Sequence, residues 1–132
     1  RDRQGLDRYR EDLFTVLTEL YINALDHGVL KLDSKLKTDA AGFSYYFRLR
    51  EERLAAIDGG VIKISLEHAP LDAGGRLTMR IEDNGDGFDE QAVLSTEDNE
   101  RPAGRGIALV RSLCDSLTYM DGGRVALAVY CW

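Results

Sequence analysis

Residues 76–89, with the sequence RLTMRIEDNGDGFD, are the most informative stretch for the fold. Leu77, Met79 and Ile81 alternate with polar residues, which predicts a β-strand with one buried face. Asp83 continues this alternation, so its carboxylate should enter the buried layer at the end of the strand. A buried carboxylate needs a hydrogen-bond partner, and an amino group of a ligand could be that partner.

Two glycines, Gly85 and Gly87, follow the strand and allow a sharp turn and a close approach of the backbone to a ligand. A calcium loop is excluded, because the aspartates follow a strand, the first glycine comes too early and Leu94 stands where the twelfth-position glutamate belongs. A surface Asn-Gly turn stays open as an alternative. That alternative explains the glycines but not the phase of Asp83.

Two helices are predicted before the first strand. Apolar residues recur at helical spacing over residues 6–27 and indicate one amphipathic helix, with Gly28 at the C-cap. A second helix is predicted over residues 43–57. Between the helices, the polar stretch 33–42 is predicted to be a connection.

Two antiparallel strands are predicted in the middle of the chain. Residues 61–67 alternate in the same way as residues 76–82, and the stretch 68–75 between them contains turn-forming residues. Each strand should therefore have one buried face. The apolar set of the first strand is Ile62, Ile64 and Leu66.

The last part of the chain is predicted to contain a loop, a helix and a hairpin. Residues 88–105 lack periodicity, and a loop of that length suggests function or disorder. Residues 106–117 have a helical pattern, and residues 118–132 read as a hairpin whose last strand places four residues on one face: Val125, Leu127, Val129 and Cys131. This order favours an α+β fold, a two-layer sandwich with helices on one face of a mixed, largely antiparallel sheet.

The composition is that of one globular domain in a chain of 132 residues, of which 44% are hydrophobic and 30% charged. Because the chain begins without Met, we expect it to be a fragment of a longer multidomain regulator. A net charge of −6 argues against nucleic acid and against an anionic membrane surface as partners. Cys114 and Cys131 are expected to be reduced, small buried residues in a cytoplasmic protein.

Polar residues form a stripe along the first predicted helix. Glu19, Asn23 and His27 recur every four residues at the edge of the apolar face. An Asn side chain can supply an oxygen ligand to Mg²⁺, and a neighbouring Glu can accept a proton. A polar helix edge that solvates and caps the helix is the alternative interpretation.

A glycine pair, Gly104 and Gly106, opens the helix predicted over residues 106–117. Helix N-termini bind phosphate through free N–H groups, and Arg105 could add a charge-assisted contact. The pattern matches neither the Rossmann fingerprint nor the P-loop. A plain junction between a loop and a helix stays open for this stretch alone.

In combination, the order and spacing of these three motifs resemble the GHKL superfamily of ATP-binding domains. That superfamily includes gyrase B, heat-shock chaperones, sensor histidine kinases and MutL. The N-box is ELYINALDHG at residues 19–28, the D-x-G-x-G box is DNGDG at 83–87, and the G-x-G box is GRGIALV at 104–110. The resemblance covers most of the chain and implies a Bergerat-type ATP-binding fold.

The resemblance also implies roles for the motif residues. Asn23 would coordinate the Mg²⁺ that bridges the phosphates of ATP, and Asp83 would accept a hydrogen bond from the adenine amino group. Residues 88–103 would be a mobile lid over the nucleotide. The remaining motif residues would shape the adenine pocket (Gly85 and Gly87) or lie by the phosphates (Gly104, Arg105 and Gly106).

Within the superfamily, the pattern Glu-x-x-x-Asn-Ala-x-x-His-Gly looks most like the bacterial anti-sigma-factor serine kinases. Glu19 would then be the general base that activates a serine of an anti-anti-sigma, STAS-type partner. A sigma factor would be a second partner, and a homodimer stays open. The alternatives are the catalytic domain of a sensor histidine kinase and a non-catalytic, nucleotide-dependent module that sequesters a sigma factor.

Two positions depart from the family pattern. Asp26 stands where these kinases often carry a basic residue, and Arg124 stands where Thr is common in a third glycine box. The stretch before Leu6 is also too short for the first strand and helix usual in the serine kinases. These departures leave the expectation of ATP binding stronger than that of phosphotransfer.

Overall fold

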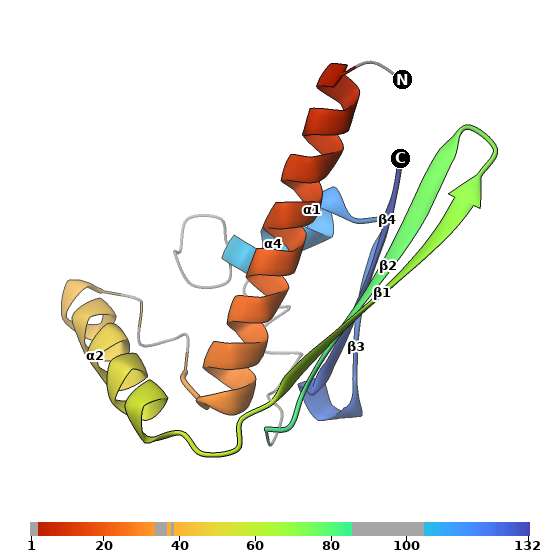
Figure 1. The fold of residues 1–132 in the computed structure, drawn as a ribbon. Helices are drawn as coiled ribbons and strands as arrows, with labels where there is room; N and C mark the ends of the chain where they lie inside the picture. Colours follow the sequence, from red (N-terminus) through yellow and green to blue (C-terminus); the bar gives the residue numbers. More distant parts are fainter. Residues whose placement is uncertain (1–2, 34–36, 38, 86–104) are drawn as a thin grey trace.

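The structure, a computed structural model, describes residues 3–33, 37, 39–85 and 105–132. It has two layers, a four-stranded sheet with α1 and α4 on one face (Figure 1). The elements, in chain order, are α1 (Arg3–Asn23), a π-helical turn (Ala24–Val29), α2 (Ala40–Ala56), β1 (Ile62–Leu71), β2 (Gly74–Asp83), α4 (Arg105–Leu113), β3 (Ser116–Met120), a 3-10 turn (Asp121–Gly123) and β4 (Val125–Cys131). The predicted α+β sandwich is confirmed, and every described strand pair is antiparallel.

The core lies between α1, α4 and the middle of the sheet. Val16 and Leu20 of α1, one turn apart, are fully buried against Met79 and Ile81 of β2. Ala128 of β4 pairs with Met79 in the sheet, and its small side chain leaves room for the helices above. Burial of side chains of this size contributes about 1.5–3 kcal/mol each. The core therefore fixes α1 over β2, and with it the helix edge that carries Glu19 and Asn23.

The prediction for β1 is wrong in one respect. Ile64 and Leu66 pair with Ile81 and Met79, so they share the core face of the sheet as expected. They are nevertheless 46% and 56% exposed. The sheet order is β1-β2-β4-β3, which makes β1 an edge strand, and the tip of the β1–β2 hairpin lies to the side of α1 and α4 (Figure 1). Alternation thus identified the face correctly, but no helix of the described residues covers it there.

Several predicted boundaries also shift. The turn between β1 and β2 is only two residues long, so most of the stretch 68–75 is strand. The helix predicted over residues 106–117 ends at Leu113, because Ser116 already pairs with β4. The hairpin of β3 and β4 is confirmed. Its core face, however, is made by the other set of residues on β4: Ala126, Ala128 and Tyr130.

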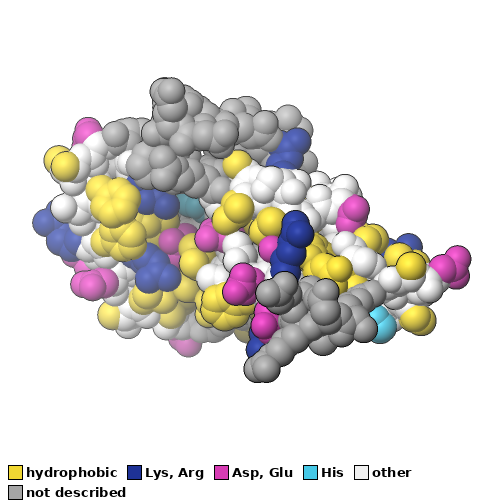
Figure 2. Space-filling model, turned by 90° about the horizontal axis from the view of Figure 1, so that it is seen from above, with side chains coloured by type: hydrophobic (Ala, Val, Ile, Leu, Met, Phe, Trp, Pro, Cys, Tyr) yellow, Lys and Arg dark blue, Asp and Glu magenta, His cyan; other side chains and the backbone are white. Residues whose placement is uncertain are grey.

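Helix α2 lies apart from the sheet, beside the C-terminal end of α1 (Figure 1). It begins three residues before the predicted start, where the Asp39 side chain accepts a hydrogen bond from the Gly42 N–H at 2.6 Å. Tyr46 is its one fully buried side chain and packs with Leu30 and Leu32 in a second, small core. On the surface at the left of Figure 2, where α2 lies, hydrophobic and basic side chains are side by side.

Cys114 directly follows α4, and Cys131 is the last residue of β4. Both cysteines are free, and Cys114 is half-buried, but Cys131 is exposed, so the prediction of burial is wrong for Cys131. Burial raises the pKa of the Cys114 thiol to about 11. Within the described ranges, no helix is both long enough and apolar enough to cross a membrane.

Candidate functional site

The candidate site begins at Asn23, on the polar edge of α1. Asn23 lines a narrow recess between α1 and the sheet. Its Nδ2 is buried and has no hydrogen-bond partner among the residues that the structure describes. Burying a polar group without a partner is costly. The Asn23 amide is therefore the position in the recess where a ligand would complete the hydrogen bonding.

Asp83 lies in the same recess, at the end of β2. It is only 4% exposed, so the inward direction expected from the strand phase is confirmed. Its carboxylate Oδ1 accepts a hydrogen bond from the Gly85 N–H at 2.8 Å. Burial raises the pKa of Asp83, although the Gly85 N–H and Arg124 oppose that effect. The site thus contains a desolvated carboxylate that can accept further hydrogen bonds.

Gly28 is part of the site, which corrects the prediction that it caps the first helix. The helix continues past Asn23 as a π-helical turn, and Gly28 lies buried inside that turn. A Cβ on Gly28 would collide with the Asp83 carboxylate, and a Cβ on Gly85 would collide with the Gly28 carbonyl oxygen. Both glycines therefore let the N-box backbone and the end of β2 touch. In the described geometry, the close neighbour of Gly85 is this backbone.

Asn84 supports the interpretation of this turn as a structural junction. Its Oδ1 accepts from the Val61 N–H at 2.9 Å, and its Nδ2 donates to the Gly59 carbonyl at 2.7 Å. Asn84 is exposed and ties the turn to the start of β1. The Asn-Gly pair accordingly builds the turn, whereas the neighbouring Asp83 faces the recess.

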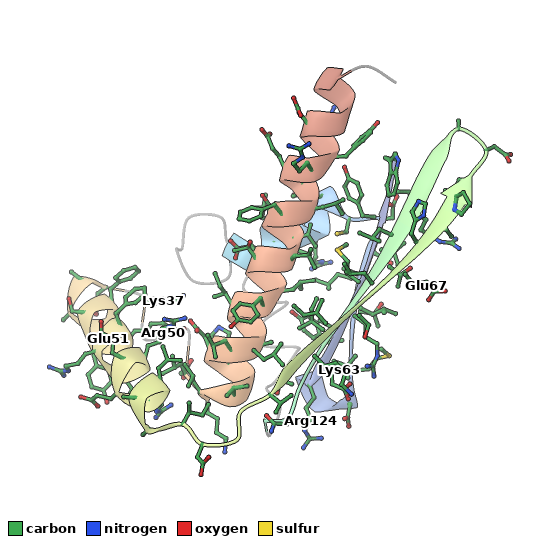
Figure 3. All side chains as sticks on the ribbon, in the orientation of Figure 1. Lys37, Arg50, Glu51, Lys63, Glu67 and Arg124 are labelled. Carbon is green, nitrogen blue, oxygen red and sulfur yellow. The ribbon has the colours of Figure 1, made fainter. Side chains whose placement is uncertain are left out.

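The recess has an apolar lining and a polar rim. Arg124 lines one side of the recess, and its Nε donates a hydrogen bond to the Gly85 carbonyl at 2.8 Å. Figure 3 shows Arg124 at the lower end of the sheet in that view. The recess combines apolar side chains with a few polar groups, as small-molecule sites do, but it is small, with an empty volume of about 190 Å³. The lining residues are Leu20, Asn23, Ala24, Ile81, Asp83, Tyr119, Gly123, Arg124 and Ala126.

Glu19 lies one helical turn before Asn23 and contacts the first turn of α4. A Cβ on Gly106 would collide with the Glu19 Oε2 in its present position, so the Glu19 carboxylate lies directly against this glycine. Arg105 is the first residue of α4. The structure therefore brings together Glu19, Asn23 and the N-terminal end of α4, as the motif order predicted. Two predicted glycines, Gly87 and Gly104, and the predicted lid at 88–103 lie outside the described residues.

Asp26, the departure in the N-box, is buried and points toward α2. Its carboxylate accepts hydrogen bonds from the Tyr46 hydroxyl and from the Arg50 Nε, both at 2.8 Å. Arg50 lies between α2 and the end of α1 (Figure 3). Burying a carboxylate requires such partners. Asp26 thus attaches α2 to the N-box, a role that the departure from the family pattern did not indicate.

His27 lies in the last turn of the π-helical segment. Its Nδ1 lies 2.7 Å from the Leu32 carbonyl oxygen, which can only accept a hydrogen bond, so Nδ1 carries a proton. Burial lowers the pKa of His27, although this hydrogen bond and Asp26 oppose the effect. The ring is therefore neutral at pH 7.

Comparison with known protein families gives one match. The model of the histidine kinase-like ATPase domain matches residues 3–129, which is nearly the whole chain. The chain belongs to the histidine kinase-like ATPase family. No curated protein and no solved structure matches the chain significantly. The expected membership of the GHKL-type superfamily is confirmed by this match, together with its α+β fold.

The residues of this ATPase domain fit ATP with Mg²⁺. The buried, unpartnered Asn23 Nδ2 matches a phosphate oxygen, and its amide oxygen is a ligand type that Mg²⁺ accepts. The buried Asp83 carboxylate matches an amino group on a flat, apolar base. Helix N-termini, such as that of α4 at Arg105, bind anions through their backbone N–H groups. Asp83 of β2 lines the same recess as Asn23, and the first turn of α4 contacts Glu19, one helical turn before Asn23, so base and phosphates would lie along the C-terminal part of α1.

The local sequence patterns did not indicate the roles of several residues of this ATPase domain. From the sequence, Gly28 is interpreted as a helix cap and Arg124 as a departure from the family pattern. Neither interpretation includes the contact that the residue makes in the structure, with Asp83 for Gly28 and with the Gly85 carbonyl for Arg124. A signal for Gly28 was available in the N-box resemblance, since this glycine closes the motif ELYINALDHG at residues 19–28. Tyr46 and Arg50 gave no such signal, because their partner Asp26 lies on another helix.

Proposed function

We propose that this ATPase domain is a Mg²⁺-dependent protein kinase that transfers phosphate from ATP to a serine of a small regulatory protein. The observation that supports it most is the contact of Glu19 with Gly106. It brings a carboxylate to the end of α4, one turn from Asn23, in a site whose other end is Asp83. A carboxylate in that position has a use in phosphotransfer that binding alone would not require.

The roles follow from this arrangement. Asp83 would hold the adenine amino group, and Asn23 would hold Mg²⁺ at the phosphates. When bound, ATP supplies the phosphoryl group: the serine oxygen bonds to the γ-phosphorus, the bond to the bridging oxygen breaks, and ADP leaves with that electron pair. Glu19 would take the proton from the serine hydroxyl. General base catalysis of this kind contributes about 10²–10⁴-fold to a rate.

The charge at Asp26 does not oppose this proposal. An unpaired carboxylate beside the phosphates would repel them, but Asp26 is neutralised by Arg50 and hydrogen-bonded by Tyr46. The departure at this position therefore weakens the case for phosphotransfer less than the sequence suggested. We propose, from the N-box pattern, that the substrate is an anti-anti-sigma, STAS-type protein in a bacterial cytoplasm.

Phosphotransfer tests this function directly. The chain is incubated with Mg²⁺ and γ-labelled ATP, with and without the candidate partner, and the labelled amino acid is identified by its stability to acid and alkali. We expect phosphoserine on the partner. Glu19→Gln should lower the rate by about 10²-fold or more while nucleotide affinity is kept, and Glu11→Gln, an exposed glutamate on the same helix, should change neither.

The other outcomes distinguish the alternatives. Acid-labile phosphohistidine would favour the catalytic domain of a sensor histidine kinase. ATP binding without transfer, to any partner offered, would favour a nucleotide-dependent binding module. Unchanged transfer by Glu19→Gln would show that Glu19 is not the base.

A further inference from the structure

We propose that Lys37, held against α2, binds the phosphate chain of the nucleotide. The proposal rests on the proposed function, because it concerns a residue at the phosphate end of the same ATP site. Lys37 belongs to the connection between the N-box and α2, which none of the family motifs includes. The proposal names the cation that, with Mg²⁺, would balance the charge of the nucleotide.

The position of Lys37 is set by Tyr46. The Lys37 Nζ lies 4.7 Å from the centre of the Tyr46 ring, and the hydroxyl of that ring donates to Asp26. A cation over an aromatic ring at this distance is attracted to its face. Tyr46 is itself fully buried. The ammonium is therefore fixed beside the N-box, and Figure 3 shows Lys37 between α2 and α1.

The Lys37 ammonium lacks an anionic partner of its own. Within the described part of the chain it makes no hydrogen bond or ion pair, because the nearby Asp26 already accepts from Tyr46 and Arg50. Burial lowers the pKa of Lys37, while the Asp26 and Glu19 carboxylates raise it. Lys37 is half-buried, so its charge is partly removed from water without an ion pair among the described residues. An anion bound beside the ammonium would supply that pair.

The carboxylates near Lys37 indicate which part of the nucleotide this lysine would contact. Glu19, Asn23 and Asp26 are spaced four and three residues apart and form one edge of the helix. Lys37 lies within electrostatic reach of both carboxylates at the two ends of that edge. Asn23, between them, has a buried Nδ2 without a hydrogen-bond partner in the described part of the chain. A phosphate chain at Asn23 would therefore have Lys37 on its α2 side.

Calorimetric titration with MgATP and with AMP tests this placement. The quantity to compare is the ratio of the AMP and ATP dissociation constants within each protein, because a general loss of fold lowers both affinities together. In Lys37→Met we expect ATP to bind about tenfold more weakly or worse, as for a lost hydrogen bond to a charged group. AMP affinity should stay within about twofold, so the ratio falls.

Two further variants control the measurement. Lys63→Met removes the same charge from an exposed position on β1 and should leave the ratio unchanged. Lys37→Arg keeps the cation and should retain most of the preference for ATP. Wild-type binding of AMP and ATP together with an unchanged ratio in Lys37→Met would refute the role of Lys37 alone. Binding of neither nucleotide by the wild type would instead refute the proposed function, and this role with it.

Discussion

Replacing Asp83 with Asn should make the protein more stable and its adenine binding weaker. The two side chains have almost the same shape, so the contact with Gly28 is preserved. The Gly85 N–H needs an acceptor, so the single amide oxygen of Asn must take the place of Oδ1. The amide nitrogen then replaces Oδ2, and it presents a donor to the adenine amino group, which is also a donor.

The size of the binding effect follows from the lost hydrogen bond, and the sign of the stability effect follows from the burial of Asp83. A hydrogen bond to a charged acceptor contributes about 1.5–3 kcal/mol, so its loss should weaken ATP binding about 10- to 100-fold. The effect on stability has the opposite sign. Burial raises the pKa of Asp83 above 3.8, so the folded protein binds the proton more tightly than the unfolded chain does. Wild-type stability is therefore lost as the pH rises from 3.8 through the folded pKa, and the Asn variant lacks this loss.

Urea unfolding at a series of pH values measures this difference, with the fluorescence of the single tryptophan, Trp132, as the signal. The stability gain of Asp83→Asn should be absent at about pH 3.8 and should grow to a plateau toward pH 7. Calorimetry at pH 7 gives the ATP affinity. A variant that is less stable than wild type at pH 7, or that binds ATP equally well, would refute the assignment of Asp83 as a desolvated adenine acceptor.

Two further predictions test the neighbours of the site. Gly28→Ala places a methyl group against the carboxylate at the end of β2, and should lower the unfolding free energy by about 1–3 kcal/mol and weaken ATP binding; unchanged urea unfolding would contradict the close packing. Tyr46→Phe removes a hydrogen bond from the buried Asp26 and should cost about 1–3 kcal/mol in the same assay. Tyr45→Phe, on the exposed side of the same helix, should stay within about 0.5 kcal/mol, and equal losses for the two tyrosines would show that the bond to Asp26 is unimportant.

Local patterns in the sequence were sufficient for the elements and for the direction of Asp83. Alternation along β2 placed Met79, Ile81 and Asp83 on one face, and the structure buries all three. The same rule failed for the burial of Leu66, because alternation says which side chains share a face but not whether another layer covers that face. Coverage depends on strand order, which places β1 at the edge and is set by contacts distant in sequence.

The site was predictable where one motif defines one element, and not where two elements meet. Glu19 and Asn23 could be placed on one edge of a helix from their spacing alone. The role of Gly28 depends on a carboxylate far along the chain, and that of Gly106 depends on Glu19. In both cases the glycine leaves space for a side chain from another element. Local sequence patterns do not describe such space, because they refer to the backbone conformation of one segment.

Asp26 shows how a departure from a motif can be resolved elsewhere in the chain. In the N-box alone, Asp26 replaces a residue that is often basic, and this replacement weakens the expectation of phosphotransfer. In the structure it is the attachment point of α2, which brings Arg50 to neutralise it and Tyr46 to hold it. Removing either partner would leave a buried charge less compensated, and that costs more than the pair itself contributes. The carboxylate and α2 therefore form one unit, and the unusual residue in the N-box is explained by the helix that follows it.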